Sequence, residues 1–361
     1  MKIVTILGTR PEIIRLSRVI PLLDQNCNHI LVHTGQNYDP RLNDIFFTDL
    51  NLRSPDYVLQ CRAGSTMAQV GSILTECEKV LSRERPDRLL ILGDTNSALS
   101  AMAAKRLGIP VFHMEAGNRC FDDRVPEEVN RRVVDHCSDI LLPYTERSRA
   151  NLLREGIPSY RIYVTGNPIL EVLDYYADKI NASMALQELG IEAGRYFLVT
   201  LHRAENVDNA KRLEKFITAL RLLNTEFGVP VICSLHPRTR CQLHKNGIIM
   251  EGGEVRAVEP LGLFDFVNLE KQAFCVLSDS GTVQEECCLF NIPNVTLRDV
   301  TERPETLEAG SGILSGCEPK SILSAVRMVT VAEKKWQAPA EYLKLNVAAT
   351  VMNIVLGLHL T

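Results

Sequence analysis

Near its start the chain reads Ile3-Val4-Thr5-Ile6-Leu7-Gly8-Thr9-Arg10-Pro11-Glu12. An apolar run rich in β-branched residues leads here directly into a turn. Pro11 follows the turn, and proline is common at the first position of a helix. The run is too short for a secretion signal and lacks a small-residue cleavage site, so we interpret it as a buried strand followed by a helix. Because the same pattern repeats along the chain, the stretch predicts an α/β fold with buried parallel sheets.

The repeats define the expected elements. Strands are predicted at residues 3–8, 30–34, 88–93, 111–115, 140–143 and 162–165, and then at 197–201, 231–235, 255–258, 275–278 and 294–297. Helical patterns are predicted between these strands, for example at 97–107, 126–136, 210–223 and 283–290, with a polar helical stretch at 174–189 and a docking helix within 340–356. A length of 361 residues suits two domains of similar size. We place Rossmann-like domains at residues 1–168 and 169–340, followed by the C-terminal helical segment 341–361.

Composition excludes several classes of protein. A net charge of -4 disfavours a nucleic-acid binder, which normally carries a basic face. No stretch reaches the roughly 18 to 20 apolar residues that span a bilayer. The eleven cysteines are an odd number without a CxxC pair, and several lie inside apolar runs. Reduced, buried thiols in a cytoplasmic protein are therefore expected, not a disulfide framework.

Polar residues follow the predicted strands at the point where each strand ends. They are Arg10, Asp94, Glu115, His202, His236 and Ser280. Ligands of open parallel sheets lie beyond the carboxyl ends of the strands, so these residues are the first candidates for a site. Neither GxGxxG after the first strand nor GxxxxGK[ST] occurs, which argues against a tightly held dinucleotide and a P-loop. No cofactor is expected.

A phosphate site is predicted where Ser280 begins a helix. Its hydroxyl and the backbone N–H groups of Gly281 and Thr282 would cradle a diphosphate at the positive end of the helix. A simple capping box is the structural alternative, and a helix cap by Ser280 is expected in either case. Glu286, one turn further on, is suited to a ribose hydroxyl, although alone it reads as a solvated helix residue.

Arginines and acids supply the remaining candidates in the first domain. Arg10 and Arg15 lie within about a turn and a half of each other, and arginine suits bidentate phosphate contact. Asp94, Glu115 and Glu127 stand at strand ends or a helix start. Taken singly, Asp94 could be a helix N-cap, Glu115 a buried hydrogen-bonded acid, and Glu127 a first-turn partner of the helix dipole. Taken together, the three acids indicate general acid/base chemistry.

In the second domain, His202 is expected to contact phosphate or substrate, whereas a structural role is as good an interpretation of His236. The spacing of these histidines gives little support to zinc, and no metal is expected. Arg303 either pairs with Glu302 or Glu305 or reaches a ligand.

Seven motifs in order then match a known family. They are Gly8-Thr9-Arg10-Pro11-Glu12, Leu92-Gly93-Asp94-Thr95, Glu115-Ala116-Gly117, Pro126-Glu127-Glu128-Val129-Asn130-Arg131, Ser278-Asp279-Ser280-Gly281, Gln284-Glu285-Glu286, and Arg298-Asp299 with Thr301-Glu302-Arg303-Pro304-Glu305. Across nearly its whole length the chain resembles the non-hydrolysing UDP-N-acetylglucosamine 2-epimerases. The resemblance implies a GT-B-like fold, a homodimer, a UDP-sugar substrate and a C-terminal helix that crosses back to the first domain.

The resemblance also implies roles for single residues. UDP would be held by Arg10, His202, Phe266, Ser280, Glu286 and Arg303, and the acid/base residues at the sugar would be Asp94, Glu115 and Glu127. His202 joins the catalytic candidates, and Arg15, His236, Gly281 and Thr282 the substrate-binding ones. Which carboxylate is the base stays open.

Three departures from the family pattern suggest a branch. Arg15 stands where lysine is usual, Thr282 replaces a second glycine, and residues 115–126 replace a longer loop. These features resemble the UDP-N-acetyl-L-fucosamine synthases, which act on a 6-deoxy-L-talose derivative. The alternatives are UDP-N-acetylglucosamine as substrate, a GT-B glycosyltransferase, a hydrolysing epimerase and a catalytically silent sensor of sugar nucleotides.

Overall fold

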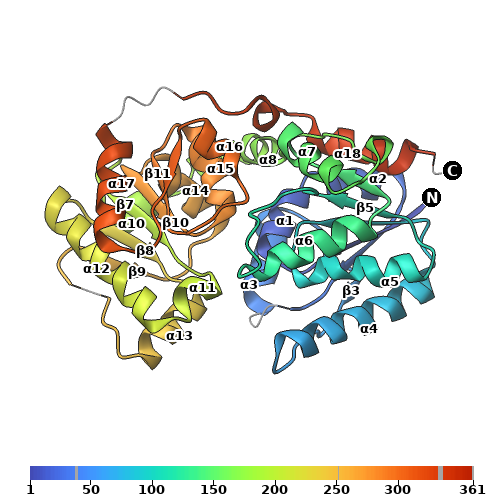
Figure 1. Ribbon diagram of the computed structural model, residues 1–361, viewed down its shortest axis with the longest axis horizontal. Helices are drawn as coiled ribbons and strands as arrows, with labels where there is room; N and C mark the ends of the chain where they lie inside the picture. The colour runs from blue at the N-terminus through green and yellow to red at the C-terminus, as the bar shows by residue number, and fades with distance from the viewer. Residues whose placement is uncertain (37–39, 251, 332–335, 360–361) are drawn as a thin grey trace. The chain divides into compact units, whose positions relative to one another are not determined.

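Each half of the chain builds one six-stranded sheet whose neighbouring strands are all parallel (Figure 1). The computed structural model describes residues 1–36, 40–250, 252–331 and 336–359. Contacts divide the chain into two units, Met1–Val172 with Glu341–Thr361, and Leu173–Ala340. The sequence placed these divisions after residues 168 and 340. The predicted α/β class with two parallel sheets is confirmed.

The first unit has the strand order β3-β2-β1-β4-β5-β6. Its strands are β1 (Lys2–Leu7), β2 (Asn28–His33), β3 (Tyr57–Val58), β4 (Arg88–Leu92), β5 (Val111–Met114) and β6 (Ile140–Leu142). Its helices are α1 (Arg10–Leu16), α2 (Val19–Asn26), α3 (Pro40–Asp49), α4 (Thr66–Glu84), η1 (Asn96–Leu99), α5 (Ser100–Arg106), α6 (Pro126–Cys137), α7 (Glu146–Arg154), η2 (Ser159–Arg161) and α18 (Val347–Gly357). Two further helices, α8 (Ile169–Tyr175) and η3 (Ala340–Leu343), include residues on both sides of a division between the units.

The second unit has the order β12-β11-β10-β7-β8-β9. Its strands are β7 (Phe197–Thr200), β8 (Val231–Ser234), β9 (Val255–Val258), β10 (Cys275–Ser278), β11 (Asn294–Thr296) and β12 (Gly312–Leu314). Its helices are α9 (Ala177–Asn181), α10 (Ala185–Leu189), α11 (Ala204–Val207), α12 (Ala210–Phe227), α13 (Pro237–Lys245), α14 (Leu263–Lys271), α15 (Gly281–Phe290), α16 (Pro304–Glu308) and α17 (Pro319–Val331).

Strand β7 explains why the strands read as continuous apolar runs. Phe197 and Val199 belong to the hydrophobic cluster that includes residues of α12 and α17. Leu198, between them, belongs to the cluster that includes residues of α14 and α15. Successive side chains of a strand point to opposite faces, so helices on both faces bury every position. The carboxyl ends of the strands are thereby left as the place for polar groups.

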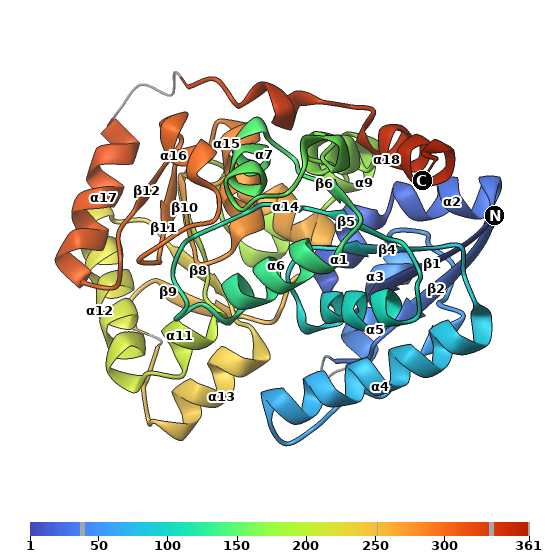
Figure 2. The ribbon, with the colours of Figure 1, turned by 45° about the vertical axis from the view of Figure 1, so that its right-hand side comes forward.

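The C-terminal helix belongs to the first unit. Helices α18 and α2 are in contact, and they lie side by side in Figures 1 and 2. Val351 and Val355 of α18 are fully buried. The guanidinium of Arg88, in β4, donates to the backbone carbonyls of Val355 and Leu358 and so satisfies carbonyls that the end of a helix leaves without partners.

One predicted strand is wrong. Residues 162–165 form a single bridge, between Ile162 and Leu141, and no strand. The N–H groups of Tyr163 and Thr165 do donate to the carbonyls of Leu141 and Pro143. The return bond of a parallel ladder would have to come from an N–H at position 143, and proline has none.

Other differences concern short elements. The edge strands β3 and β12, of two and three residues, were not predicted. The predicted helical stretch 174–189 is divided among the end of α8, α9 and α10, and the predicted helix 97–107 begins as the 3-10 turn η1. Such short elements carry little periodicity, which is why sequence patterns do not resolve them.

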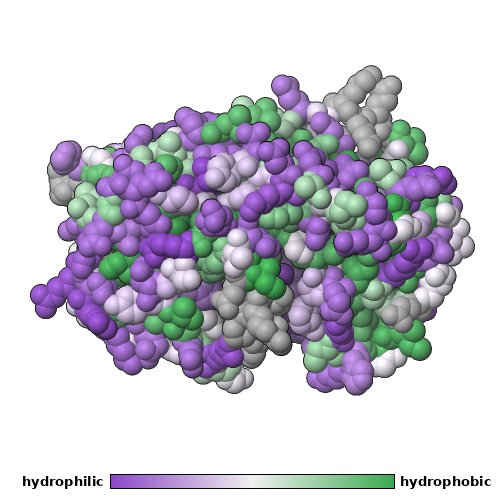
Figure 3. Space-filling model, turned by 180° about the vertical axis from the view of Figure 1, so that it is seen from behind, coloured by the Kyte–Doolittle hydropathy of each residue, from purple (hydrophilic) through white to green (hydrophobic). Residues whose placement is uncertain are grey.

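The remaining composition-based expectations concern the surface and the cysteines. Among the described helices, none has both the length and the apolar character needed to cross a membrane. Hydrophobic residues lie scattered among hydrophilic ones on the face drawn in Figure 3. None of the eleven cysteines forms a disulfide within the described part of the chain.

Candidate active site

The predicted residues of the first unit gather at the carboxyl edge of its sheet. Arg10 follows β1, Asp94 follows β4 and Glu115 follows β5. These strands are neighbours, with Ile6 paired to Ile91 and Leu92 paired to Met114. Contacts described below connect all three strand ends.

Glu12 fastens the turn after β1 to the end of β4. Its carboxylate accepts hydrogen bonds from Gly8 N (3.0 Å), Thr9 Oγ1 (2.7 Å) and Thr95 Oγ1 (3.2 Å). Burial raises the pKa of Glu12 to about 7, and these hydrogen bonds oppose the rise. Glu12 belongs to the motif Gly8-Thr9-Arg10-Pro11-Glu12, which did not predict this role for it. Its position two residues after Arg10 was the available signal.

The two arginines of α1 have different surroundings. The Arg10 guanidinium lies 5.6 Å from the centroid of the Phe46 ring, and its partial burial lowers its pKa. Arg15 is almost fully buried; its Nε lies 3.7 Å from Oε2 of Glu115 and its Nη1 donates to Asn167 Oδ1 (3.2 Å). Arg15 thus contacts a predicted acid, a partnership that the sequence did not indicate.

Glu115 has an unusual backbone. Its φ is +67°, in the left-handed region that a residue with a Cβ seldom adopts. The side chain is 7% exposed and directed to Arg15, and its backbone N–H donates to the Leu142 carbonyl of β6 (3.1 Å). Backbone strain of this kind occurs preferentially at functional sites.

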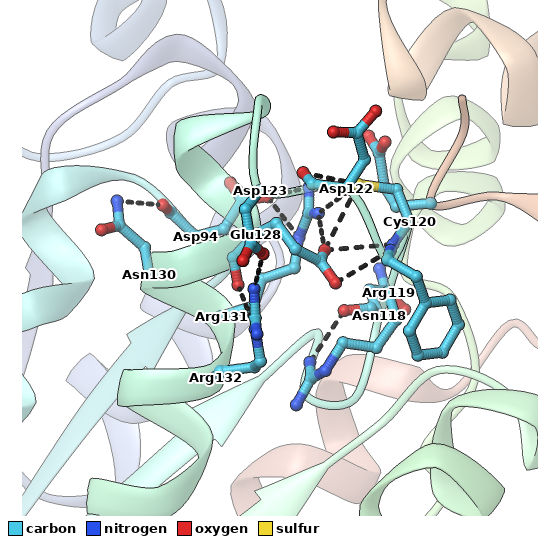
Figure 4. A network of polar contacts seen from close by, with 12 residues as sticks. Asp94, Asn118, Arg119, Cys120, Asp122, Asp123, Glu128, Asn130, Arg131 and Arg132 are labelled. Atoms are coloured by element: carbon cyan, nitrogen blue, oxygen red, sulfur yellow. Dashed lines mark hydrogen bonds and ion pairs between the residues drawn. The ribbon is translucent and has the colours of Figure 1, made fainter. Parts of the chain in front are cut away.

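Arg131 joins the end of β4 to the loop that follows β5 (Figure 4). Its Nε and Nη2 donate to Oδ2 of Asp94 (2.8 and 2.5 Å), and its Nη1 donates to Oε2 of Glu128 (2.8 Å). Glu128 also accepts from the backbone N–H groups of Cys120 and Phe121, both at 3.0 Å. Asp94 is therefore no helix N-cap; Thr95 caps η1 instead.

His113 and Asp135 form a second buried pair at this edge of the sheet. His113 Nδ1 is 2.8 Å from Asp135 Oδ1, and its Nε2 is 2.8 Å from the carbonyl of Gly93, the residue before Asp94. Asp135 also accepts from Gly117 N–H (3.1 Å) and Arg119 (2.8 Å). Burial opposes ionisation of Asp135, but the hydrogen bond from His113 and the charges of His113 and Arg119 outweigh it and lower its pKa.

The third predicted acid, Glu127, lies in the first turn of α6, where a carboxylate interacts favourably with the helix dipole. It is half-buried and comes directly before Glu128. Glu115 lies beside Arg15, and Asp94 belongs to a buried ion network whose other members, Arg131 and Glu128, sequence reasoning did not identify. Their spacing of three residues on one helix was the available signal.

In the second unit, Ser280 stands at the N-cap of α15 as predicted, but the expected cap is wrong, because its side chain accepts no hydrogen bond from the N–H groups of the helix. Its backbone N–H donates to Ser278 Oγ (3.0 Å), and its carbonyl accepts from Gln284 (3.3 Å). A Cβ at Gly281 would lie 2.8 Å from Glu302 Oε1, so a larger residue at position 281 would displace the Glu302 side chain. Thr282 follows in the first turn.

Arg303 lies in a buried ion cluster. Its Nε donates to Oε1 of Glu285 (2.5 Å), and its Nη1 lies 3.8 Å from Oε1 of Glu302. Glu302 also pairs with Arg298 (2.8 Å) and Arg203 (3.2 Å). Of the expected partners Glu302 is therefore present, and Glu285 is the closer one that the sequence missed. Three guanidinium groups and three carboxylates lie in this cluster, because Arg203 also pairs with Glu205 (4.0 Å), and it is the backbone N–H groups at the amino end of α15 that suit an anion.

Asp279 fixes the backbone that follows β7 through hydrogen bonds. It accepts from the backbone N–H groups of His202 (3.0 Å) and Arg203 (2.9 Å), and its Oδ1 lies 3.1 Å from His202 Nδ1. Burial opposes ionisation of Asp279, but its contacts with His202, Arg203 and Asn206 outweigh burial and lower its pKa.

His236, whose ring centroid is 5.8 Å from that of His202, accepts from Arg238 N–H and so caps α13. This is the structural role that the sequence analysis considered for it.

The other two predicted contacts of the second unit are partly or fully buried. Glu286 is 4% exposed, and Phe266 of α14 packs against the hydrophobic cluster around Leu269. Burial and then the charge of Glu286 raise the pKa of Glu270 well above its ordinary value. Glu286 is therefore no solvated helix residue, the alternative that the sequence left open.

Metal ligation finds no support in the described residues, which hold no cluster of three or more His, Cys, Asp or Glu arranged for an ion. What the geometry offers is two sets of groups. The first unit supplies carboxylates held by arginines, suited to moving protons. The second supplies a helix amino end with arginines, suited to a diphosphate.

Comparison with known proteins agrees with this chemistry. The family model described as UDP-N-acetylglucosamine 2-epimerase matches residues 23–356. A UDP-N-acetylglucosamine 2-epimerase of Methanococcus maripaludis is 41% identical over 99% of this chain and 98% of its own. A UDP-2,3-diacetamido-2,3-dideoxy-D-glucuronate 2-epimerase of Pseudomonas aeruginosa is 37% identical over 91% and 92%.

Solved structures agree on the fold. The Methanocaldococcus jannaschii UDP-GlcNAc 2-epimerase in complex with UDP-GlcNAc and UDP superposes with a TM-score of 0.93, at 39% identity over 98% of this chain and 99% of that one. A glycosyltransferase of lipopolysaccharide biosynthesis superposes with a TM-score of 0.60 at 11% identity, over 99% of this chain and 100% of that one, a likeness of fold alone. The predicted GT-B-like fold is confirmed.

Proposed function

The chain belongs to the UDP-N-acetylglucosamine 2-epimerase family, and we propose that it inverts C2 of a UDP-activated N-acetylamino sugar without hydrolysing it. The observation that carries this proposal is the presence of two buried acid–arginine contacts at the carboxyl edge of the first sheet. There Arg131 holds Asp94, and Arg15 lies beside Glu115.

The chemistry explains why several carboxylates are needed. The hydrogen on C2 is not next to a carbonyl group, so its direct removal as a proton is very unfavourable. We propose that a base takes the proton while the C1–O bond breaks, the electron pair forms C1=C2, and UDP leaves as the anion. Returning a proton to the opposite face of C2 and the UDP oxygen to C1 completes the inversion. An acid/base pair and stabilisation of the leaving diphosphate account for the whole reaction.

We assign Asp94, Glu115 and Glu127 to the sugar. Both bonds from Arg131 reach Oδ2 of Asp94, so neither of them occupies Oδ1, and the side chain retains 19% exposure. Glu115 is held in its strained conformation by Arg15 and by the hydrogen bond from its backbone N–H to Leu142. A proton-transfer group needs such a fixed position, because it must lie within hydrogen-bond reach of the sugar when C1–O breaks. His202, paired with Asp279, joins them as a catalytic candidate.

UDP is assigned to the second unit. In this proposal Ser280, Gly281 and Thr282 at the start of α15 bind the diphosphate. Arg303 supplies positive charge to the same site, Glu286 binds the ribose, and Phe266 is a further contact of UDP. The hydroxyl of Ser280 supports the assignment, because it makes no capping bond to its own helix. Arg10, Arg15 and His236 remain proposed substrate contacts; Arg15 and His236 have established partners within the fold.

Ser280→Ala is expected to weaken UDP binding about tenfold, the effect of one hydrogen bond to a charged group. Isothermal titration calorimetry with UDP measures the change. Thr225→Ala on α12 is the matched control, since its hydroxyl donates only to the carbonyl of Arg221 in its own helix. Arg303→Ala is a poorer probe, because it also leaves the buried carboxylate of Glu285 without its closest cation. Unchanged affinity in Ser280→Ala would contradict the assignment.

We propose two candidate sugars, in order of priority. UDP-N-acetylglucosamine is the first substrate to test, because relatives that are 41% identical over nearly the whole chain are named as 2-epimerases of this compound. The 6-deoxy-L-talose compound of the fucosamine branch, the sequence-based choice, is the second; the comparisons do not single that branch out. A relative named for a glucuronate derivative indicates that the family accommodates different groups at C6. A homodimer and a cytoplasmic location stay predictions.

Incubation with a single UDP-sugar in deuterated water tests the proposal. Deuterium at C2 with no acceptor present, seen by NMR, is the expected result. Product without C2 deuterium, or turnover that requires an acceptor, would instead identify a glycosyltransferase. Accumulation of UDP and reducing sugar in stoichiometric amounts would identify a hydrolysing epimerase.

A further inference from the structure

Left-handed backbone is concentrated in the loop between β5 and α6. In the described chain, five residues other than glycine have a positive φ: Asn51, Arg85, Glu115, Phe121 and Asn291. Arg85 and Asn291 are the C-cap residues of α4 and α15, and Asn51 lies two residues beyond α3, all normal places for this conformation. Glu115 and Phe121 end no helix.

Phe121 is the more unusual of the two. An aromatic residue with φ +57° loses folding free energy to the clash of its Cβ with the backbone. Its ring is 73% exposed, so little burial of apolar surface offsets that loss. Evolution of the fold alone would favour glycine or asparagine here. A strained and exposed phenylalanine is therefore explained by function.

The surroundings of Phe121 fix its backbone from both sides. Before it, the N–H groups of Cys120 and Phe121 itself each donate to Glu128 at 3.0 Å, and Glu128 is buried. After it, Asp122 accepts from the N–H groups of Arg124 (to Oδ1, 3.0 Å) and Val125 (to its carbonyl, 3.0 Å). The exposed ring is thus presented by a rigid loop.

The same network links the ring to the proposed acids. The loop starts at Glu115 and leads into the helix that carries Glu127. Arg131, which pairs with Glu128, also binds Asp94, and Figure 4 shows these residues converging with the loop. Phe121 is therefore held in a fixed relation to the groups assigned to the sugar, within one unit of the fold.

We propose that Phe121 is a specificity-determining residue whose ring packs against the C–H face of the amino sugar. The inference rests on the proposed function. A phenyl ring has no hydrogen-bonding group, so it recognises only the apolar surface of a ligand, and a pyranose offers such a surface in its axial C–H bonds. The contact concerns the sugar and leaves the nucleotide to other residues.

The test compares affinities for UDP-N-acetylglucosamine and for UDP by calorimetry. Phe121→Ala should weaken the sugar nucleotide about fivefold and UDP by less than about twofold. Phe121→Tyr, which retains the ring, should preserve both affinities. Tyr160→Ala, which removes an equally exposed ring (75%) from η2, should change neither. In steady-state kinetics the loss in Phe121→Ala should appear in KM more than in kcat.

Phe121→Gly separates recognition from folding. It should lose the same sugar affinity and unfold at a temperature no lower than that of the wild type, because glycine adopts φ +57° without strain. Unchanged sugar affinity in Phe121→Ala, or equal losses for UDP and the sugar nucleotide, would overturn the proposal. A wild-type protein that binds the sugar nucleotide but introduces no deuterium at C2 would refute the proposed function and not this contact.

Discussion

Glu115→Gln is expected to reduce turnover by about 100- to 10,000-fold, the usual contribution of a proton-transferring side chain. The glutamine keeps the size and shape of the side chain, so the left-handed turn should persist. UDP affinity, assigned to the second unit, should change by less than about threefold. Loss of C2 deuterium incorporation with intact UDP binding is the combined result that the proposal requires.

Two controls keep this result interpretable. Glu146→Gln, on the exposed start of α7, should leave turnover unchanged. Because Arg15 loses part of its charge compensation in Glu115→Gln, a moderate fall in thermal stability is expected and should be recorded for the variant. Turnover within about threefold of the wild type in a folded Glu115→Gln protein would remove Glu115 from the reaction.

Arg131→Met is expected to have the largest effect on stability. The substitution keeps an unbranched side chain but leaves the carboxylates of Asp94 and Glu128 without their shared cation. Removing one partner of a buried ion pair costs about 3–5 kcal/mol, which urea unfolding measures as a lower midpoint at unchanged slope. Turnover should fall as well, because Asp94 and the loop from Cys120 lose their common support.

The control for this variant lies in the same segment. Arg124 pairs with Asp122 at the surface, with a side chain that is 76% exposed. Arg124→Met should therefore change the free energy of unfolding by about 0–1 kcal/mol. Adding Glu128→Gln to Arg131→Met should recover part of the loss, since one uncompensated charge is removed. Equal stabilities of Arg131→Met and Arg124→Met would contradict the buried network.

Sequence reasoning was most successful where a residue's position follows from a strand end. Apolar runs such as residues 231–235 predict buried parallel strands, and the rule that ligands lie beyond their carboxyl ends leads to Asp94, Glu115 and Ser280. These inferences need only local pattern and the geometry of parallel sheets.

The interaction partners of the site residues could not be predicted from the sequence. Glu285 binds Arg303 and Arg15 lies beside Glu115 because separate elements meet in space, and no spacing along the chain encodes such pairs. Likewise, the missing N–H of Pro143 matters only because residues 162–165 run beside it. The strain at Phe121 is a property of backbone angles, which residue types do not reveal.

The return of α18 to the first unit has a consequence for synthesis on the ribosome. Residues 173–340 form one uninterrupted stretch, whereas the first unit lacks α18 until residue 357 has been made. At translation speeds of about 5–20 residues per second, the nascent first unit waits on the order of 10–40 s with the surface beneath Val351 and Val355 uncovered. The first unit therefore cannot complete its native packing until the last residue of the second unit has been made.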